Sequence, residues 1–417
     1  MSIADLVRSS SAIERPGTQL HAPQVRVVDE SGQPPASAGQ TVNPDIISAK
    51  VTNVASGVSQ LELVLNNQRH NAQHRPLVPT WRYNGLDTVT FGTRMRVDFR
   101  YGNGPWTPMI LARITDIDFL FPTATGAQLT LKGDDLLSLL KTNPAQSRLY
   151  RNLQEVDIVR AAVNESGAGL SVRATAPTPA FPTPLANATH QGAITYLQFI
   201  ESLAARMDFE TYVDFDDLAP GSNSSAVSLH FEPARSATLG TPVDLQWGRD
   251  LLEFKPAFKG WDLLTNAVAS GTQPGRRRPF SASVTMADAI NDLHTADGGS
   301  VPLPAWQARR RAFNNENRPD SHTESLSVTQ IDEDRARLQA TAVLRRSARQ
   351  FLTVDITTPG VPGLRPGRHV NVQGFHAPFD GIYYVTQTVH SLSAVGYLTV
   401  SSLRRPGMLD PSVYPGG

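Results

Sequence analysis

The last fifty residues of the chain carry the pattern that most limits its fold. Apolar and polar residues alternate at 352–357, and the alternation returns at 370–372, 383–389 and 398–400. A period of two is typical of strands that bury one face. Pro-Gly and Asp-Gly pairs between these stretches allow the chain to turn. The pattern therefore predicts four short antiparallel strands that close into a small barrel or sandwich.

A second series of alternating stretches occupies the first third of the chain. It runs through 61–65, 94–99, 109–117 and 128–131, with Asn-Gly and Gly-rich turns between the stretches. These stretches predict another barrel-like unit.

The middle of the chain has helical periodicity instead. Apolar residues recur at helical spacing over 155–165 and 194–207, and strand-like stretches follow at 209–213 and 226–231. We predict a small α+β unit here. A further amphipathic helix is predicted over residues 331–351, directly before the C-terminal strands.

Together these patterns predict a mainly β protein in which two tube-like antiparallel β-barrel domains flank a small α+β domain. The expected division is a flexible N-terminal arm at 1–45, the first barrel at 46–140, the α+β domain at 141–242, the second barrel at 243–405 with a polar insertion at 271–317, and a C-terminal tail at 406–417.

The composition argues against several classes of function. Lys plus Arg and Asp plus Glu number 38 each, so the chain has no overall field that would draw it to nucleic acid or to an anionic membrane. Cysteine is absent, which excludes disulfides and thiolate metal sites. The first residues lack the apolar core of a signal peptide, and no apolar run approaches the roughly 20 residues that cross a bilayer. We expect assembly in the cytoplasm and no membrane segment.

Two groups of side chains could hold a metal ion. The three aspartates within 214–217 precede a Ser-rich stretch at 222–225, and their oxygens suit Ca²⁺ or Mg²⁺. A solvated hairpin loop is the alternative, because the Gly and Glu of an EF-hand are missing at their offsets. His70 and His74 have a zinc spacing if the segment is helical, but Asn and Pro around them favour a surface loop without a third ligand.

Catalytic and phosphate-binding patterns are scarce. The acids at 134–135 and 332–334 could form the carboxylate pair of a glycosidase, but both groups stand at predicted helix starts, where Asp134 would act as a cap. Gly-x-Ser-x-Gly, P-loop and dinucleotide-binding motifs do not occur. The arginines at 276–278 and 309–311 could contact phosphates, or could be solvated loops or face an acidic protein. We predict no catalytic residue, no cofactor, no metal and no nucleic-acid binding.

A set of spaced motifs resembles the phage tail hub proteins, the late-control protein D group. It is also similar to the hub portion of spike proteins in type VI secretion and in extracellular contractile injection systems. The residues that carry this resemblance are Gly133, Asp134, Asp157, Gln191, Phe199, Gly363, Pro366, Gly367, Gly374, Phe379, Gly381, Tyr383, Val385, His390, Gly396, Tyr397 and Thr399.

The resemblance implies a structural role, in which these residues, His390 included, maintain the fold. Such hubs carry two tube-like barrels per chain, and three chains form a pseudo-hexameric ring between a six-fold inner tube and a three-fold spike. The implied partners are two further copies, a separate trimeric spike protein, the inner tube protein, and baseplate wedge or tape-measure proteins. The implied location is a phage tail or a contractile injection particle. The alternatives are a tail-associated cell-wall-degrading enzyme and a carbohydrate-binding β-sandwich.

Overall fold

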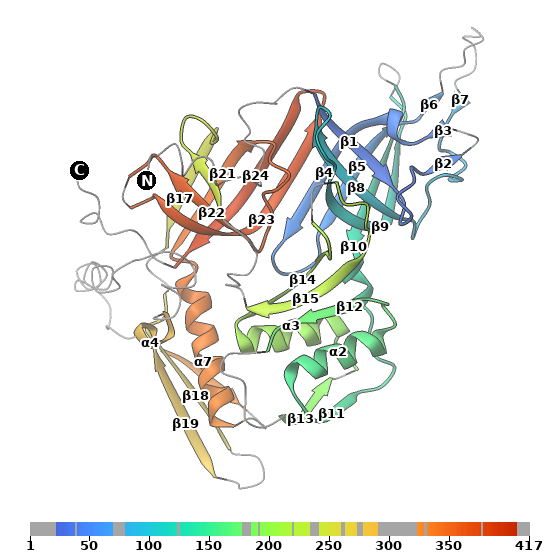
Figure 1. The fold of residues 1–417 in the computed structure, drawn as a ribbon. Helices are drawn as coiled ribbons and strands as arrows, with labels where there is room; N and C mark the ends of the chain where they lie inside the picture. Colours follow the sequence, from blue (N-terminus) through green and yellow to red (C-terminus); the bar gives the residue numbers. More distant parts are fainter. Residues whose placement is uncertain are drawn as a thin grey trace.

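A large sheet and a smaller helical portion make up the molecule. In Figure 1 the sheet fills the upper part, and the helices with their small sheets lie beneath it. The computed structural model describes residues 22–37, 40–69, 80–122, 126–176, 185–190, 192–218, 221–233, 242–259, 263–272, 278–290, 323–328, 332–376 and 378–406.

The first half of the large sheet consists of six strands from the N-terminal third. Their order across the sheet is β1 (Pro23–Val28), β8 (Arg94–Tyr101), β9 (Thr107–Leu120), β10 (Gln128–Asp135), β5 (Gln60–Asn66) and β4 (Ile46–Val54). Buried Leu61, Leu63 and Leu65 alternate with more exposed residues along β5, as the sequence pattern predicts. They pack into one hydrophobic core beneath these strands.

The second half consists of six strands from the C-terminal part. Along the main path lie β23 (Gly381–Ser393), β24 (Gly396–Arg405), β21 (Leu352–Pro359) and β17 (Glu253–Phe258), while β22 (His369–Gln373) pairs with β23 and with β16 (Val243–Gln246). The four strands predicted from the final alternation are therefore present. They bury a separate core that includes Leu352, Val354 and Ile356.

The two halves join into one continuous sheet, which corrects the prediction of two barrels. Strand β4 pairs with β23 in antiparallel register, from Ala49 opposite Leu392 to Val54 opposite Gln387. Among the described strands no ladder closes on itself, because the main path of the twelve-stranded sheet ends at β1 and β17, and β22 and β16 form a side branch. Alternation shows which residues are strands and which face is buried, but it does not determine which edges meet, so the barrel prediction was wrong on this point.

Part of the predicted N-terminal arm belongs to the sheet. Strand β1 pairs with β8 along its whole length, so the expectation of a flexible arm is wrong for Pro23–Val28. The Val27 N–H on its other side donates to the Asn43 side chain at 2.7 Å. Short elements complete this region: η1 (Asn43–Asp45), the pair β2 (Ala36–Ser37) and β3 (Gln40–Thr41), and the pair β6 (Gln68–Arg69) and β7 (Thr80–Trp81).

The α+β unit follows the sequence prediction closely. Helices α2 (Glu155–Ser166) and α3 (Tyr196–Met207) are amphipathic, and Gly167 ends α2 in the left-handed region at φ 70°. The remaining elements are η2 (Leu136–Leu140), the pair β11 (Arg148–Leu153) and β13 (Leu185–His190), and the sheet β12 (Ser171–Ala174), β15 (Val227–Pro233) and β14 (Phe209–Phe215).

Elements assigned to the second barrel also pack in this lower portion. They are β18 (Asn266–Thr272), β19 (Pro279–Thr285), α4 (Met286–Ile290), β20 (Thr323–Val328) and α7 (Glu333–Ala348). Ala336, Ala340 and Leu344 recur at helical spacing on α7 and enter the same core as α2 and α3. The helix predicted over 331–351 is thus confirmed, but it covers the α+β unit. No described helix is long and apolar enough to span a membrane.

Candidate functional site

One face of the large sheet carries side chains that stay accessible across both halves. The ladder registers place seven of them in one row, none buried: Glu253, Thr357, Val400, Val389, Thr52, Gln60 and Asp134. A parallel row contains Leu398, Ser391, Lys50, Glu62, Lys132 and Asp116. We call this surface the open face.

Charges of both signs are interspersed on the open face. Lys132 lies 2.7 Å from Asp118, and its hydrogen bond with that carboxylate raises the pKa of Lys132. A shallow hollow of about 170 Å³ opens beside Lys50, Glu62 and Lys132. Acids and bases alternate across its walls, so the hollow has no field of one sign that would concentrate a charged small molecule.

Buried ion pairs hold the α+β unit in place. The acids come from the middle of the chain and the arginines from its last third: Glu155 with Arg335 at 2.6 Å, Asp208 with Arg349 at 2.5 Å, Glu210 with Arg404 at 2.6 Å and Asp214 with Arg365 at 2.7 Å. The last two connect strand β14 to the large sheet. Hydrogen-bonded pairs of this kind fix one geometry, because either partner alone would leave a buried charge.

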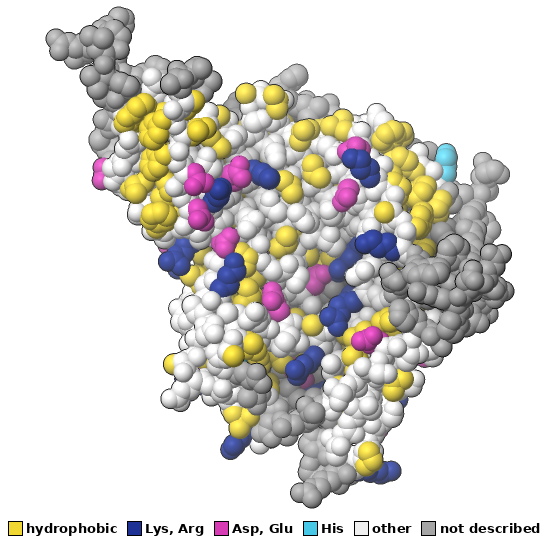
Figure 2. Space-filling model, turned by 180° about the vertical axis from the view of Figure 1, so that it is seen from behind, with side chains coloured by type: hydrophobic (Ala, Val, Ile, Leu, Met, Phe, Trp, Pro, Cys, Tyr) yellow, Lys and Arg dark blue, Asp and Glu magenta, His cyan; other side chains and the backbone are white. Residues whose placement is uncertain are grey.

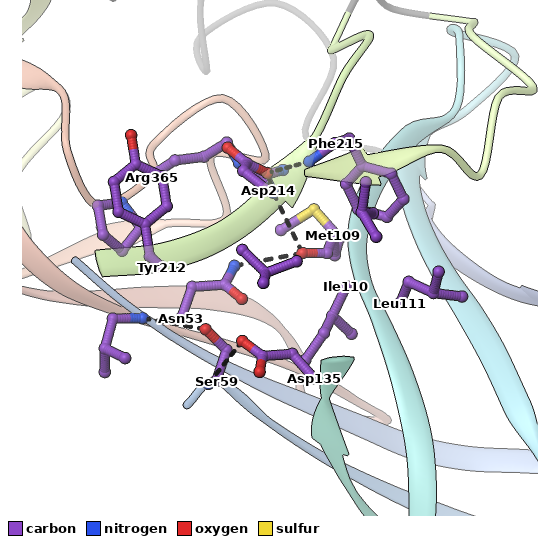
Figure 3. Close-up of a pocket in the computed structure, with 14 residues that line it drawn as sticks. Asn53, Ser59, Met109, Ile110, Leu111, Asp135, Tyr212, Asp214, Phe215 and Arg365 are labelled. Atoms are coloured by element: carbon purple, nitrogen blue, oxygen red, sulfur yellow. Dashed lines mark hydrogen bonds and ion pairs between the residues drawn. The ribbon is translucent and has the colours of Figure 1, made fainter. Parts of the chain in front are cut away.

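We call these four acid–arginine pairs the clamp. Figure 3 shows the place where its Asp214–Arg365 pair meets the sheet, around a small cavity of about 30 Å³. Arg365 donates to the carbonyl of Pro108 at 2.6 Å, to that of Met109 at 3.3 Å, and to Asp214. Below it in the figure, Asn53 donates to the Met109 carbonyl at 3.3 Å. A cavity of this size has room for about one water molecule. The guanidinium and the carboxylate are therefore engaged with each other and not exposed to a substrate.

Asp135 lies at the floor of the same junction. Its carboxylate accepts from the backbone N–H groups of Ser59 at 2.8 Å and Leu137 at 3.0 Å. Burial nevertheless raises the pKa of Asp135 to about 7, because desolvation outweighs these two donors. Asp135, and not Asp134 as predicted, is the N-cap of η2, while Asp134 pairs with Lys141 at 3.0 Å. The extended backbone of Asp135 directs its own carboxylate to the helix start.

The other carboxylate groups of interest also have structural partners. Asp332 caps α7 by accepting from the Arg335 N–H, as predicted. Asp216 accepts from Ser228 Oγ at 2.5 Å and lies 3.2 Å from Arg173. No cluster of three metal-ligating side chains is found among the described residues. Asp214 belongs to β14, and Asp216 and Asp217 follow it in the connection to β15, with which β14 pairs in antiparallel register.

Several predicted sites fall outside the described residues. These are His70, His74, Gln191, Arg276, Arg277 and the arginines at 309–311. The Ser-rich stretch at 222–225 is described, and Ser224 offers its carbonyl to buried Arg96 at 2.9 Å.

The N-terminal motif residues occupy packing positions. A Cβ on Gly133 would lie 2.9 Å from the Arg113 carbonyl, at a bulge where β10 meets β9. Asp157 stands in the first turn of α2 and pairs with Arg160 at 3.0 Å. Phe199 of α3 stacks on His190 with ring centroids 4.5 Å apart.

The glycines of the C-terminal motif stand at turns, together with Pro366. Gly367, Gly374, Gly381 and Gly396 have φ between 79° and 125°, where a side chain would be strained, while Gly363 faces open space. Among the apolar members, Val385 is fully buried, and Tyr383 donates to the Phe379 carbonyl at 2.5 Å.

His390 is a buried hydrogen-bonding residue, as predicted. Its Nε2 lies 3.0 Å from the Leu364 carbonyl and must donate there, so Nδ1 accepts from the hydroxyls of Tyr397 at 2.9 Å and Thr399 at 3.1 Å. Burial lowers the pKa of His390 to about 3. The imidazole is neutral and fully engaged, which suits a structural residue and not a general base.

The sequence reasoning missed the clamp arginines and an aromatic strip along the edge of the sheet. Phe254 and Phe375 have ring centroids 4.1 Å apart, and Phe258 and Phe379 have centroids 5.8 Å apart. These contacts join residues about 120 positions apart, so no local pattern could reveal them. The only available signal was the number of aromatic residues around 247–258 and 375–379.

Comparison with solved structures shows which proteins share this fold. No protein-family model and no curated protein sequence matches the chain. A tail protein from Neisseria meningitidis MC58 aligns with a TM-score of 0.60 over 95% of this chain and 100% of its own, at 13% identity. The 43 kDa tail protein of prophage MuSo2 from Shewanella oneidensis gives 0.58 over 93% and 100%, also at 13% identity. A chain of the half-lidded Francisella PdpA-VgrG complex gives 0.51 over 99% of this chain and 62% of its own, at 9% identity. The chain therefore has the fold of phage tail proteins, as its motif resemblance implied.

Proposed function

We propose that the protein is a structural hub of a contractile phage tail or injection system. Three copies would form a ring of pseudo-six-fold symmetry that joins a six-fold inner tube to a three-fold spike. The observation that carries this proposal is the division of the sheet into two halves of six strands each, joined edge to edge by β4 and β23. Three chains with two comparable halves present six similar units to a six-fold partner.

The internal construction of the chain suits a load-bearing part. The α+β unit is fixed to the sheet by largely buried pairs at Asp214 and Glu210, and the two halves share a backbone ladder. The open face combines small, polar and mixed-charge side chains. Such a surface could line a passage without retaining cargo of one charge sign. The partners on either side would be the inner tube and a separate trimeric spike, with baseplate wedge or tape-measure proteins around them.

The cell-wall enzyme has no observation in its favour. Asp135 caps a helix, Asp214 pairs with Arg365, and burial keeps His390 neutral. The sugar-binding alternative has none either. Neither function is proposed.

The mass of the assembled protein tests the hub proposal. We expect light scattering on the purified full chain, measured over a concentration series, to approach three times 45.3 kDa. Electron-microscope class averages should then show rings with six similar lobes. A species that remains monomeric at the highest concentration, alone and with a tube protein present, would refute the ring. Release of muropeptides that is lost in Asp214→Asn would support the enzyme instead.

A further inference from the structure

Two clusters of exposed and half-buried apolar side chains lie near opposite ends of the large sheet. The tip cluster consists of Trp81, Phe119, Leu120 and Phe121, at the end of the β9–β10 hairpin and the adjoining β7. The edge cluster consists of Trp247, Leu252, Phe254, Phe258, Phe375 and Phe379, along β17. Figure 2 shows hydrophobic side chains gathered toward the two upper ends of the molecule, with charged side chains of both signs between them.

Both clusters are preformed. In the tip cluster Phe121 contacts Trp81 edge to face at 4.9 Å and stacks with Phe119 at 6.0 Å between centroids, while neighbouring Leu120 remains 57% exposed. In the edge cluster Phe254 stacks on Phe375, yet Phe258 and Trp247 stay nearly half exposed. Contiguous exposed aromatic groups of this kind are typical of protein interaction sites.

Strand β17 is an edge strand that resists the addition of another strand. Pro256 lies in the middle of β17 and cannot donate a backbone hydrogen bond. A proline on an edge strand blocks continuous pairing with a partner strand. A partner at this edge must therefore be held by side chains, which favours an apolar surface as the occupant over an extended peptide.

The two clusters also carry complementary charge. On the strand that leads into the tip cluster, Asp118 is paired with Lys132, and Asp116 lies opposite the same lysine and also raises its pKa. Beside the edge cluster, Lys255 is paired with Glu253 at 2.7 Å, and exposed Lys259 follows directly after Phe258. Two acids at one end therefore share a single base, and the other end carries Lys259, which has no ion pair among the described residues.

We propose that the edge cluster of one copy binds the tip cluster of the next copy. Two different patches at opposite ends of one subunit make a head-to-tail contact, and head-to-tail contacts close into a ring when the rotation permits. In the ring, Lys259 of each subunit faces the partner subunit's Asp116. This inference rests on the proposed hub function, because it identifies the surfaces that would hold that ring together.

Single charge insertions test the contact. Leu120→Asp in the tip cluster and Phe258→Asp in the edge cluster should each raise the concentration at which rings form by at least about tenfold, since each puts a carboxylate into an apolar contact. Leu149→Asp is the matched control, because Leu149 is equally exposed on β11 but belongs to neither cluster. Circular dichroism would verify that every variant is folded.

Mixing the two variants separates a head-to-tail contact from a symmetric one. The Leu120→Asp variant keeps an intact edge cluster, and the Phe258→Asp variant keeps an intact tip cluster. In a one-to-one mixture, each pair of molecules can therefore form one unaltered edge-to-tip contact. Sedimentation velocity should show dimers that grow no further. In a separate pair, Asp116→Lys and Lys259→Asp should each weaken rings, and the double variant should restore them.

The outcomes distinguish this contact from the hub proposal. If the unmodified chain forms rings and both carboxylate variants form them equally well, the contact is refuted and the hub proposal stands. If no ring forms, the cysteine-free chain allows Leu120→Cys and Phe258→Cys to be combined and treated with a short bis-maleimide. A ladder of dimers and trimers would then support the contact. Monomers alone would refute both the contact and the ring.

Discussion

Replacing Arg365 by alanine would test whether buried ion pairs fix the α+β unit to the sheet. Arg365 lies in the turn after β21 and is almost fully buried. Its guanidinium joins the carbonyls of Pro108 and Met109, at the start of β9, to Asp214 at the end of β14. One side chain thus connects three segments that lie between 100 and 260 residues apart in the sequence.

The magnitude follows from what the substitution leaves behind. Asp214 would remain as a mostly buried carboxylate without its cation, and removal of one partner from such a pair costs about 3–5 kcal/mol. That is a large share of a typical unfolding free energy of about 5–15 kcal/mol. Arg365→Lys should fall between wild type and Arg365→Ala, because one ammonium keeps the charge but cannot reach three acceptors in a fixed plane.

Urea unfolding and hydrogen exchange would measure the effect. We expect faster exchange in peptides from β14 and the start of β9 before any change in the other strands of the first half of the sheet. A double-mutant cycle with Asp214→Ala should give a coupling energy of about 0.5–3 kcal/mol. Arg160→Ala is the control, since its exposed pair with Asp157 should contribute less than about 1 kcal/mol. If Arg365→Ala lowers the free energy of unfolding by less than about 0.5 kcal/mol, which is the range of ordinary surface substitutions, then the clamp does not fix the unit to the sheet.

Further substitutions probe three single features of the fold. Gly360→Ala should lower the melting temperature, because its Cβ would lie 2.1 Å from the Tyr397 ring and overpacking costs about 1–3 kcal/mol, whereas Gly363→Ala meets nothing within 4 Å and should be tolerated. The pKa of His390 is lowered to about 3 from an unfolded value of about 6.5, so its contribution is complete above pH 6.5 and is lost as the pH falls toward 3. In urea titrations, wild type should therefore lose about 2–3 kcal/mol more than His390→Gln between pH 7 and 4.5. Thr195→Ala should cost about 1 kcal/mol in thermal unfolding, because it removes the capping box of α3.

Local pattern was sufficient for most elements of this fold. The alternation at 352–400 predicted β21 to β24, and the helical spacing at 155–165 and 194–207 predicted α2 and α3. Each of these elements buries one face, so apolar residues recur along it at the period of a strand or of a helix. The turn glycines of the motif have the same origin, because positive φ is required there and the residue type reveals it.

Long-range pairing could not be predicted in this way. The union of β4 with β23 brings together residues more than 330 positions apart, and both strands would look the same at the edges of two separate barrels. The clamp was hidden for a similar reason, since an arginine such as Arg404 has no sequence signal that identifies Glu210 as its partner. We wrongly assigned strands β18 to β20 to the second barrel. Their alternating pattern shows that one face is apolar, but it does not show which hydrophobic core that face packs into.

The union of the two halves has a consequence for the proposed ring. If each half were a separate barrel, loops would set the angle between them, and the ring could change its diameter as that angle changed. Here the pairing from Ala49 opposite Leu392 to Val54 opposite Gln387 holds the halves through backbone hydrogen bonds. From below, Asp214 of the α+β unit pairs with Arg365, which also bonds the β9 carbonyl of Pro108, and Glu210 pairs with Arg404 on β24. These contacts oppose bending between the halves. The angle within a subunit is therefore set by the fold, and any adjustment to a six-fold or three-fold neighbour must take place at the contacts between subunits.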